Sequence, residues 1–541
     1  SNFTILDRAD SEDLVGLLRQ EVHTGHKTVR FPRKETLADL FSRAVNRGED
    51  IATAVEREAP HFFYCLDDIT TIARLYEAAK RERNLMDYDD LLVHLAALLR
   101  GNETIRRQAS ETYRHILVDE YQDTNRIQAE ILRLLAFTHD NAMVVGDDSQ
   151  SIYSFRGANF RNIMDFPSDF PGAKVVFLEE NYRSRQPILD VTNEIIAGAR
   201  EKFPKHLFTT RAGGEKATLL SSPNERLQSV FVADRILSLH EDEGVPLSEI
   251  AVLFRAAYLS FDLEVELVKR HIPYRKFGGF KFLETAHVKD VIAHLRLIDN
   301  PRDALSLSRA LMLVPGIGRK VSADISREAH AEASLLPVLS SLKARKRSEE
   351  AVRLAALLAE LGARHDGSAE GTLPVSEMMA RVIAYYRPFL EARFDDYPRR
   401  LKDLDHLESL CARFRKLSEF LSEITLEPPQ ASVGDIAAPG EERDTLTLST
   451  IHSAKGLEWK AVFILWVLDG KLPLSRAAES EEELEEERRL LYVAATRAKD
   501  LLIMTYPVNI YERASGTVLS KPSRFVEEIR QGILPRFSLI E

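Results

Sequence analysis

Two adjacent carboxylates, Asp119 and Glu120, directly follow the apolar run Ile116-Leu117-Val118. Such a run predicts a short strand, and ligands of parallel α/β sheets bind at the carboxyl ends of the strands. At that position one carboxylate could hold Mg²⁺ while the other orients or deprotonates an attacking water, which is the chemistry of nucleotide hydrolysis. The alternative is a strand followed by an acidic helix cap, and the two acids by themselves leave both interpretations open.

A second polar block follows along the chain, at residues 144–158. Its apolar start leads into Gln150, which could sense a terminal phosphate. Tyr153 and Phe155 come next, and their π-faces could stack on unpaired bases. The alternative for these two aromatics is core packing, which is common for an isolated i, i+2 pair.

The elements that must position these side chains follow from the pattern of apolar residues. Residues 3–110 and 319–425 have helical patterning, as does Val288–Ile298, and residues 426–443 are typical of a linker. Short apolar runs predict the remaining strands, at Met143–Val145, Val175–Leu178, Ile250–Phe254, Thr445–Leu448, Ala461–Leu468 and Leu501–Met504. Strands that alternate with helices indicate a parallel α/β fold, here with helical insertions.

Composition excludes several classes of protein. The chain has 541 residues, which is enough for about three or four domains, and its 44% apolar and 29% charged residues are typical of a globular protein. The longest apolar run, Ala461–Leu468, is too short to cross a bilayer, so no membrane association is expected. Two cysteines, Cys65 and Cys411, fit a reducing compartment, and we expect the cytoplasm. The net charge of −11 argues against indiscriminate binding to nucleic acids.

The blocks around Asp119, Gln150 and Tyr182, in this order, resemble the superfamily 1 DNA helicases of the UvrD/Rep/PcrA type. Further matching stretches lie at Phe3–Ile5, Asp87–Leu92, Leu446–Phe463 and Glu486–Lys499. The resemblance implies an ATP-dependent helicase or translocase that moves 3′ to 5′ on single-stranded DNA. It also implies action at junctions of single and double strands, in DNA repair or replication restart, with repair or replication proteins as partners.

The same resemblance implies the domain organisation. It predicts two RecA-like domains of the P-loop NTPase type, each with a parallel sheet and a mainly helical insertion. The first helical insertion would be residues 1–110, and the first RecA-like domain 111–178. The second RecA-like domain would be 179–300 and 439–541, interrupted by the second helical insertion at 301–438.

The roles that the resemblance implies at the nucleotide concern seven residues. Asp119 would hold Mg²⁺, Glu120 would activate water, and Gln150 would contact the terminal phosphate of ATP. The other implied roles are stacking on adenine by Tyr182, binding of the ribose by Glu458, and clamping of the γ-phosphate by Arg183 and Arg497, both from the second α/β domain.

The implied nucleic-acid contacts lie elsewhere in the sequence. Tyr153 and Phe155 would stack on bases, and Arg156 and His452 would contact the nucleic acid. Gly316 and Gly318, in the stretch 315–320, would approach duplex phosphate; the alternative there is a plain turn between helices.

One family feature has no counterpart in the sequence. No segment fits the phosphate-binding loop G-x-x-x-x-G-K-[ST], and the single Gly-Lys pair, Gly470-Lys471, is followed by leucine. We therefore expect the first RecA-like domain to be incomplete, to leave strand edges around Ile116–Val118 without partners, and to impair ATP hydrolysis by this chain alone.

Three other functions stay open. The chain could be a non-hydrolytic fragment that binds single-stranded DNA, the helicase part of a helicase-nuclease, or an interaction protein that keeps the fold. Two charged runs carry little information. Lys343–Arg347 could contact phosphate, but a solvated helix face is the favoured interpretation, and the glutamate-rich Glu479–Glu487 is expected to cap and solvate the helix that leads to Arg497.

Overall fold

The computed structural model describes residues 3–22, 30–277, 285–301, 303–318, 321–322, 325, 349–364, 373–412, 414–425, 444–512 and 517–539. The chain forms two compact units, one from Ser1–Gly213 and Pro473–Thr496, the other from Gly214–Leu472 and Arg497–Glu541. The run Lys343–Arg347 and the predicted linker 426–443 lie outside the described residues. Among the described residues, no helix has both the length and the apolarity to span a bilayer.

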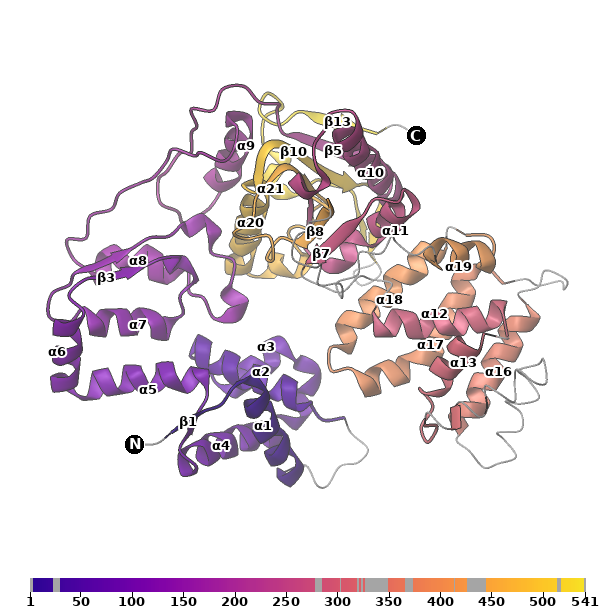
Figure 1. The fold of residues 1–541 in the computed structure, drawn as a ribbon, viewed down its shortest axis with the longest axis horizontal. Coiled ribbons are helices and arrows are strands. Elements are labelled where there is room, and N and C mark those ends of the chain that lie inside the picture. Colours follow the sequence, from indigo (N-terminus) through magenta and orange to yellow (C-terminus); the bar gives the residue numbers. More distant parts are fainter. Residues whose placement is uncertain are drawn as a thin grey trace. The chain divides into compact units, whose positions relative to one another are not determined.

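The first unit is mainly helical. Figure 1 shows its amino-terminal helices in indigo and violet. Capping boxes start two of these helices, α5 and α7, where Asp87/Asp90 and Asn125/Gln128 satisfy backbone N–H groups of the first turns. Its helices and first strand pair are β1 (Thr4–Ile5), α1 (Arg8–Val22), α2 (Lys34–Arg47), α3 (Ile51–Glu58), α4 (Leu66–Glu82), β2 (Leu85–Met86), α5 (Tyr88–Gly101), α6 (Glu103–Thr112), α7 (Arg126–Leu135), α8 (Arg161–Asp169), α9 (Gln186–Ala197) and α20 (Glu481–Ala495).

A parallel strand pair forms the sheet that carries the acidic pair. β3 (Ile116–Val118) pairs with β4 (Ala142–Val144), with Leu117 opposite Met143. One face of this pair packs on α7 and α8 through Ile116, Val118 and Val144. The opposite face is open, since Leu117 is 73% and Met143 58% exposed. Among the described residues, β3 and β4 pair only with each other.

The predicted strand at Val175–Leu178 is wrong. Residues 174–179 take no part in a strand ladder in the structure, and Leu178 is 84% exposed. The nearest pairing is an isolated bridge between Glu180 and Phe208. An apolar run becomes a strand only when a neighbouring strand accepts its hydrogen bonds, and no described strand lies alongside this one.

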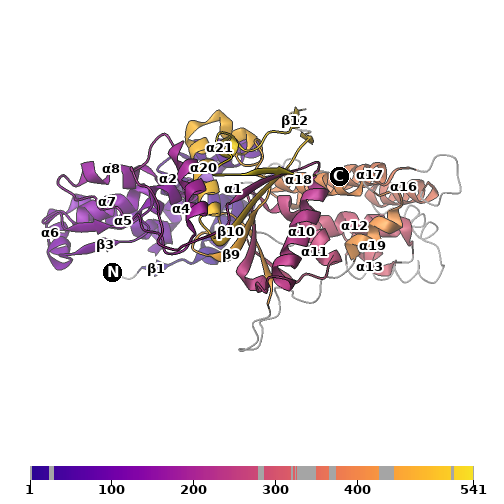
Figure 2. The same ribbon diagram turned by 90° about the horizontal axis from the view of Figure 1, so that it is seen from above.

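The second unit is built on a seven-stranded sheet in which every pairing is parallel. The strand order is β13-β5-β10-β9-β6-β8-β7, and the buried residues of β6 and β9 form its centre. Helices α10 and α11 pack on the sheet (Figure 2). The elements are β5 (Thr218–Ser222), α10 (Glu225–Glu241), β6 (Ile250–Phe254), α11 (Phe261–Lys269), β7 (Tyr274–Phe277), β8 (Leu446–Thr450), β9 (Trp459–Ile464), β10 (Ala498–Pro507), β11 (Ile510–Glu512), β12 (Thr517–Leu519), α21 (Arg524–Glu527) and β13 (Arg536–Ser538).

A helical insertion separates β7 from β8. Its helices gather around α12 in both ribbon views (Figures 1 and 2), and a continuous apolar core joins them. They are α12 (Ala286–Asp299), α13 (Ala304–Leu311), α16 (Glu349–Ala363), α17 (Val375–Arg393), α18 (Tyr397–Cys411) and α19 (Leu417–Thr425). The predicted fold class, α/β with parallel sheets and helical insertions, is confirmed.

Candidate functional site

The acidic pair lies where β3 ends. Asp119 and Glu120 are both exposed, and the Glu120 N–H donates to Asp119 Oδ1 at 2.9 Å. Glu120 has a φ of 49°, in the left-handed region that non-glycine residues rarely adopt. Such a conformation costs about 1–3 kcal/mol and persists only where surrounding contacts impose it. Here the next N–H, that of Tyr121, donates to the carbonyl of Val145 at 3.0 Å and fixes the turn.

A fully buried glutamine connects this pair to the block after β4. Gln122 Nε2 donates to Glu120 Oε2 at 2.5 Å, and Gln122 Oε1 accepts the Asp147 N–H at 3.0 Å. Asp147 Oδ2 in turn accepts from Gln150 Nε2 at 2.9 Å. The structure therefore brings Glu120 and Gln150 into one hydrogen-bonded network through two residues that the sequence analysis did not single out.

Lys205 is a third member of the network that sequence reasoning missed. Its ammonium group forms ion pairs with Asp147 and with Asp148, the latter at 2.6 Å. Burial alone would lower the pKa of Lys205, but the charges and hydrogen bonds of Asp147 and Asp148 raise that pKa above its ordinary value. Lys205 is thus a fixed cation that neutralises two aspartates, and Asp148 is buried.

The segment that carries Lys205 also holds the stretch before Tyr182. The His206 N–H donates to Glu179 Oε1 at 2.7 Å, and the Asn181 N–H donates to the Phe208 carbonyl at 2.7 Å. Residues 203–208 therefore connect the network after β4 to the turn that precedes α9.

Tyr182 and Arg183 occupy that turn. The Tyr182 ring is 75% exposed, and its hydroxyl donates to Glu180 Oε2 at 2.9 Å. The Arg183 N–H donates to Asn181 Oδ1 at 2.9 Å, and the guanidinium of Arg211 donates to the Arg183 carbonyl. The backbone of the turn is fixed, while the tyrosine ring presents its surface to solvent.

The two aromatics after β4 form a small platform with an arginine. The rings of Tyr153 and Phe155 are 5.9 Å apart at an interplanar angle of 64°. The Arg156 guanidinium lies 5.1 Å from the Tyr153 ring centre and 5.5 Å from that of Phe155. Both rings are half-buried, so base stacking and packing against the protein both fit this geometry.

His452 begins a loop in the second unit. The loop follows β8, and the N–H of Ile451 donates to the carbonyl of Phe254, the last residue of β6, at 3.0 Å. His452 therefore lies at the carboxyl edge of the sheet, and its side chain is half-buried.

Glu458 and Arg497 lie together at the opposite edge, where β9 and β10 begin. The Trp459 N–H donates to the Arg497 carbonyl at 3.0 Å, and Arg497 Nη1 donates to the Leu457 carbonyl at 3.2 Å. Arg497 is almost completely buried, whereas Glu458 is partly exposed and lies 3.3 Å from the Lys499 ammonium.

Gly316 and Gly318 belong to an exposed turn after α13. Gly316 has a φ of 84°, and added Cβ atoms at both glycines would meet open space. Buried Val314 and Ile317 anchor the turn to the helical core. A phosphate contact and a plain turn both fit this geometry. Arg319 and Lys320 lie outside the described residues.

The donor chemistry at Asp119 fits Mg²⁺. Among the described residues, no group of three or more His, Cys, Asp or Glu side chains could hold a metal ion. Mg²⁺, however, is usually held by one or two carboxylates together with phosphate oxygens and water. An exposed carboxylate at the carboxyl end of a strand meets that requirement.

A parallel strand pair with acids and a glutamine at its carboxyl edge, a second parallel sheet and helical insertions define a nucleotide hydrolase of the two-RecA-domain class. The model of the UvrD/REP helicase N-terminal domain matches residues 1–171, and that of the UvrD-like helicase C-terminal domain matches residues 176–361 and 376–509.

Similar curated proteins agree with these matches. The ATP-dependent DNA helicase PcrA of Staphylococcus epidermidis is 33% identical over 98% of this chain and 73% of its own length. The ATP-dependent DNA helicase UvrD1 of Mycobacterium tuberculosis is 32% identical, over 99% of this chain and 72% of its own length. The chain belongs to the UvrD/REP helicase family, so the resemblance predicted from the sequence motifs is confirmed.

Proposed function

We propose that this protein is an ATP-dependent helicase or translocase that acts on single-stranded DNA. The observation that carries the proposal is the network that joins Glu120 to Gln150 through buried Gln122 and Asp147. A residue that activates water and a residue that senses a phosphate act together only if their geometry is fixed in common. The names of the similar proteins, ATP-dependent DNA helicases, support the same reaction.

In the proposed reaction, Asp119 would hold Mg²⁺, and the bound ion would supply positive charge beside the phosphates of ATP. Glu120 orients the attacking water and accepts its proton, and Gln150 contacts the terminal phosphate. Arg183 and Arg497 stabilise charge on the γ-phosphate.

The remaining proposed contacts recognise the base, the sugar and the nucleic acid. Tyr182 stacks on adenine and Glu458 binds the ribose hydroxyl. Tyr153 and Phe155 stack on unpaired bases. Arg156 and His452 contact single-stranded DNA, and Gly316 and Gly318 approach duplex phosphate. We also propose that the protein moves 3′ to 5′, acts at strand junctions and works in DNA repair or replication restart. Its proposed location is the cytoplasm. Two buried cysteine thiols support a reducing compartment.

We further propose that the 541-residue chain hydrolyses ATP slowly by itself, because its sequence offers no glycine-rich loop to bind the phosphates. Phosphate release measured with and without oligo(dT) tests this: weak turnover is expected, and robust DNA-stimulated turnover would contradict it. DNA binding without any turnover would favour the non-hydrolytic alternative.

The role of Glu120 has its own test. Glu120→Gln keeps the shape of the side chain but removes the base, so ATP turnover should fall by about 100-fold or more. Glu111→Gln, an exposed change of the same charge on α6, is the matched control. Equal turnover by the two variants would refute the assignment.

A further inference from the structure

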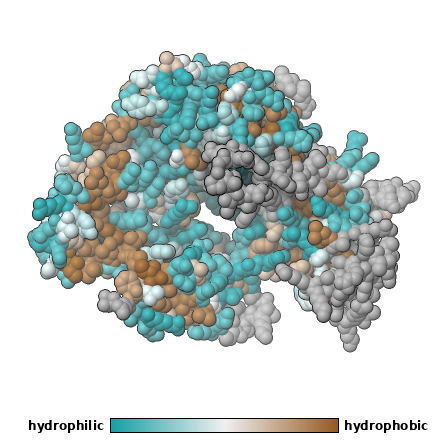
Figure 3. Space-filling view, viewed as in Figure 1, coloured by the Kyte–Doolittle hydropathy of each residue, from teal (hydrophilic) through white to brown (hydrophobic). Residues whose placement is uncertain are grey.

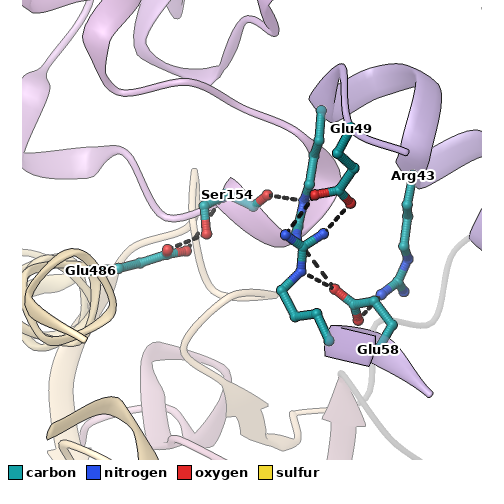
Figure 4. Close-up of polar contacts among 7 residues, drawn as sticks. Arg43, Glu49, Glu58, Ser154 and Glu486 are labelled. Atoms are coloured by element: carbon teal, nitrogen blue, oxygen red, sulfur yellow. Dashed lines mark hydrogen bonds and ion pairs between the residues drawn. The ribbon is translucent and has the colours of Figure 1, made fainter. Parts of the chain in front are cut away.

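Ser154 lies between the two aromatics of the platform and is held from two sides (Figure 4). On one side Glu486 of α20 accepts the Ser154 N–H at 3.3 Å and also its hydroxyl hydrogen bond. On the other side Arg47, the last residue of α2, donates from Nε to the Ser154 carbonyl at 3.1 Å. The N–H and hydroxyl of Ser154 thus bind to α20, and its carbonyl binds to α2.

Helix α20 also contacts the same loop through Arg489. Arg489 Nε donates to the Ser151 carbonyl at 2.7 Å, and its guanidinium lies 4.6 Å from the centre of the Phe160 ring. Glu486 and Arg489 are three residues apart, so they project from one face of the helix. Their partners on the loop, Ser154 and Ser151, are also three residues apart in the sequence.

The α2 side is braced by further charges. Arg47 Nη1 lies 3.3 Å from Glu58 of α3, and Glu58 also pairs with Arg43 and with Arg57, the latter at 3.3 Å. Figure 4 shows Arg43, Glu49 and Glu58 close together. Glu49 pairs with Arg57. Arg47 therefore reaches Ser154 with its own position fixed.

We infer that Glu486 is a positioning residue for the base-stacking platform and acts through Ser154. Tyr153 and Phe155 flank Ser154 directly, so the backbone position of Ser154 sets where both rings point. The inference rests on the proposed function, because it assumes that the platform stacks on bases of single-stranded DNA.

The solvent exposure of Ser154 and Glu486 indicates that their contact contributes little to folding, which distinguishes a positioning role from a structural one. Ser154 is exposed and Glu486 is half-buried, and polar contacts of such groups add little to stability. Arg489, by contrast, is desolvated enough that burial lowers its pKa. Arg489 anchors α20 to the loop, while Glu486 fixes the geometry of the platform at little cost to folding when it is removed.

The test measures stacking directly. Glu486→Gln and Ser154→Ala should each weaken binding of fluorescein-labelled oligo(dT) by about five- to tenfold, within the range of the net contribution of a typical hydrogen bond. Quenching of 2-aminopurine in a single strand, which reports base stacking, should fall in parallel. Melting temperatures should stay close to that of the unmodified chain.

Controls exclude simpler explanations. Glu482→Gln removes the same charge from the exposed face of α20 and should change neither signal, whereas Ser154→Thr keeps the hydroxyl and should restore both. The double variant of Glu486→Gln and Ser154→Ala should lose less binding than the sum of the two single losses, because both changes weaken the same pair of hydrogen bonds between Ser154 and Glu486.

The outcomes are distinct. If the unmodified chain binds and quenches and Glu486→Gln does so equally, the inference is overturned while the proposed function stands. If the unmodified chain neither binds nor quenches, the proposed function fails and the inference falls with it. Additive losses in the double variant would also overturn the link between Glu486 and Ser154.

Discussion

Gly146→Ala should break the network that joins the two predicted nucleotide-binding blocks. A Cβ atom built at Gly146 would lie 2.3 Å from Gln122 Oε1, 2.9 Å from Ile163 Cδ1 and 3.3 Å from the Tyr121 nitrogen. A carbon and an oxygen that are not bonded need roughly 1 Å more than the first of these distances. Because the backbone and the isoleucine limit any shift of the new methyl group, the amide of Gln122 must move.

That movement has a calculable cost. Gln122 is fully buried and would lose its hydrogen bonds with the Asp147 N–H and the Glu120 carboxylate. Each loss costs about 1–2 kcal/mol, and overpacking adds about 1 kcal/mol or more. We expect the free energy of unfolding of the first unit to fall by about 3 kcal/mol, and the melting temperature by roughly 5–10 °C.

Calorimetry with two matched variants gives the decisive comparison. Gly101 is the last residue of α5, and an added Cβ there meets open space. The Gly101→Ala variant should therefore be as stable as the unmodified chain or slightly more stable. In a Gln122→Ala background the clash with Gln122 Oε1 is absent while the contact with Ile163 remains, and Gly146→Ala should then cost at least about 1 kcal/mol less. Equal melting of Gly146→Ala and Gly101→Ala, or an unchanged cost in the Gln122→Ala background, would refute the reasoning.

Three further predictions concern buried charges. Lys80→Met should cost about 3–5 kcal/mol in denaturant unfolding, because it leaves the carboxylates of the α5 capping box unpaired. Lys34→Met, which removes an exposed ion pair, should cost much less, and equal costs would contradict the argument. Burial lowers the pKa of His294 below 6.5, so stability should fall as the pH decreases below that value, by up to about 1.4 kcal/mol per pH unit. His294→Gln should remove this dependence, and an unchanged slope would refute it. Lys205→Met should cost about 3 kcal/mol, and Asp148→Asn should recover part of that loss because it removes the unpaired buried charge. If Asp148→Asn recovers none of the lost stability, the unpaired charge of Asp148 is not the cause of the loss.

The sequence predicts the nucleotide-binding network only in part. Parallel strands align their carboxyl ends, so residues after Val118 and after Val144 had to lie near each other, and Glu120 and Gln150 do. Lys205 was not predictable in this way. It lies in a stretch without strand or helix periodicity, and only the folded chain brings it to Asp147.

The glutamate-rich run shows why charge patterns are ambiguous. Ser480 caps α20 and three glutamates fill its first turn, as the cap interpretation predicts. Further along, Glu486 binds Ser154 and Glu487 is buried, so these two are not part of a solvated face. A run of identical residues gives no signal for which members face the protein, because that depends on the register of the helix against its neighbours.

The open face of the β3–β4 pair has a related cause. Figure 3 shows apolar residues gathered on the side of the first unit that carries β3. Leu117 of β3 and Met143 of β4 are both exposed. Strands covered on both faces have continuous apolar runs, and Ile116-Leu117-Val118 is such a run. In the described residues, α7 and α8 cover only one face. The apolar run of β3 therefore predicts a strand that is covered on both faces. Among the described residues only one face of β3 is covered, so the prediction from the sequence and the observed exposure differ for the other face.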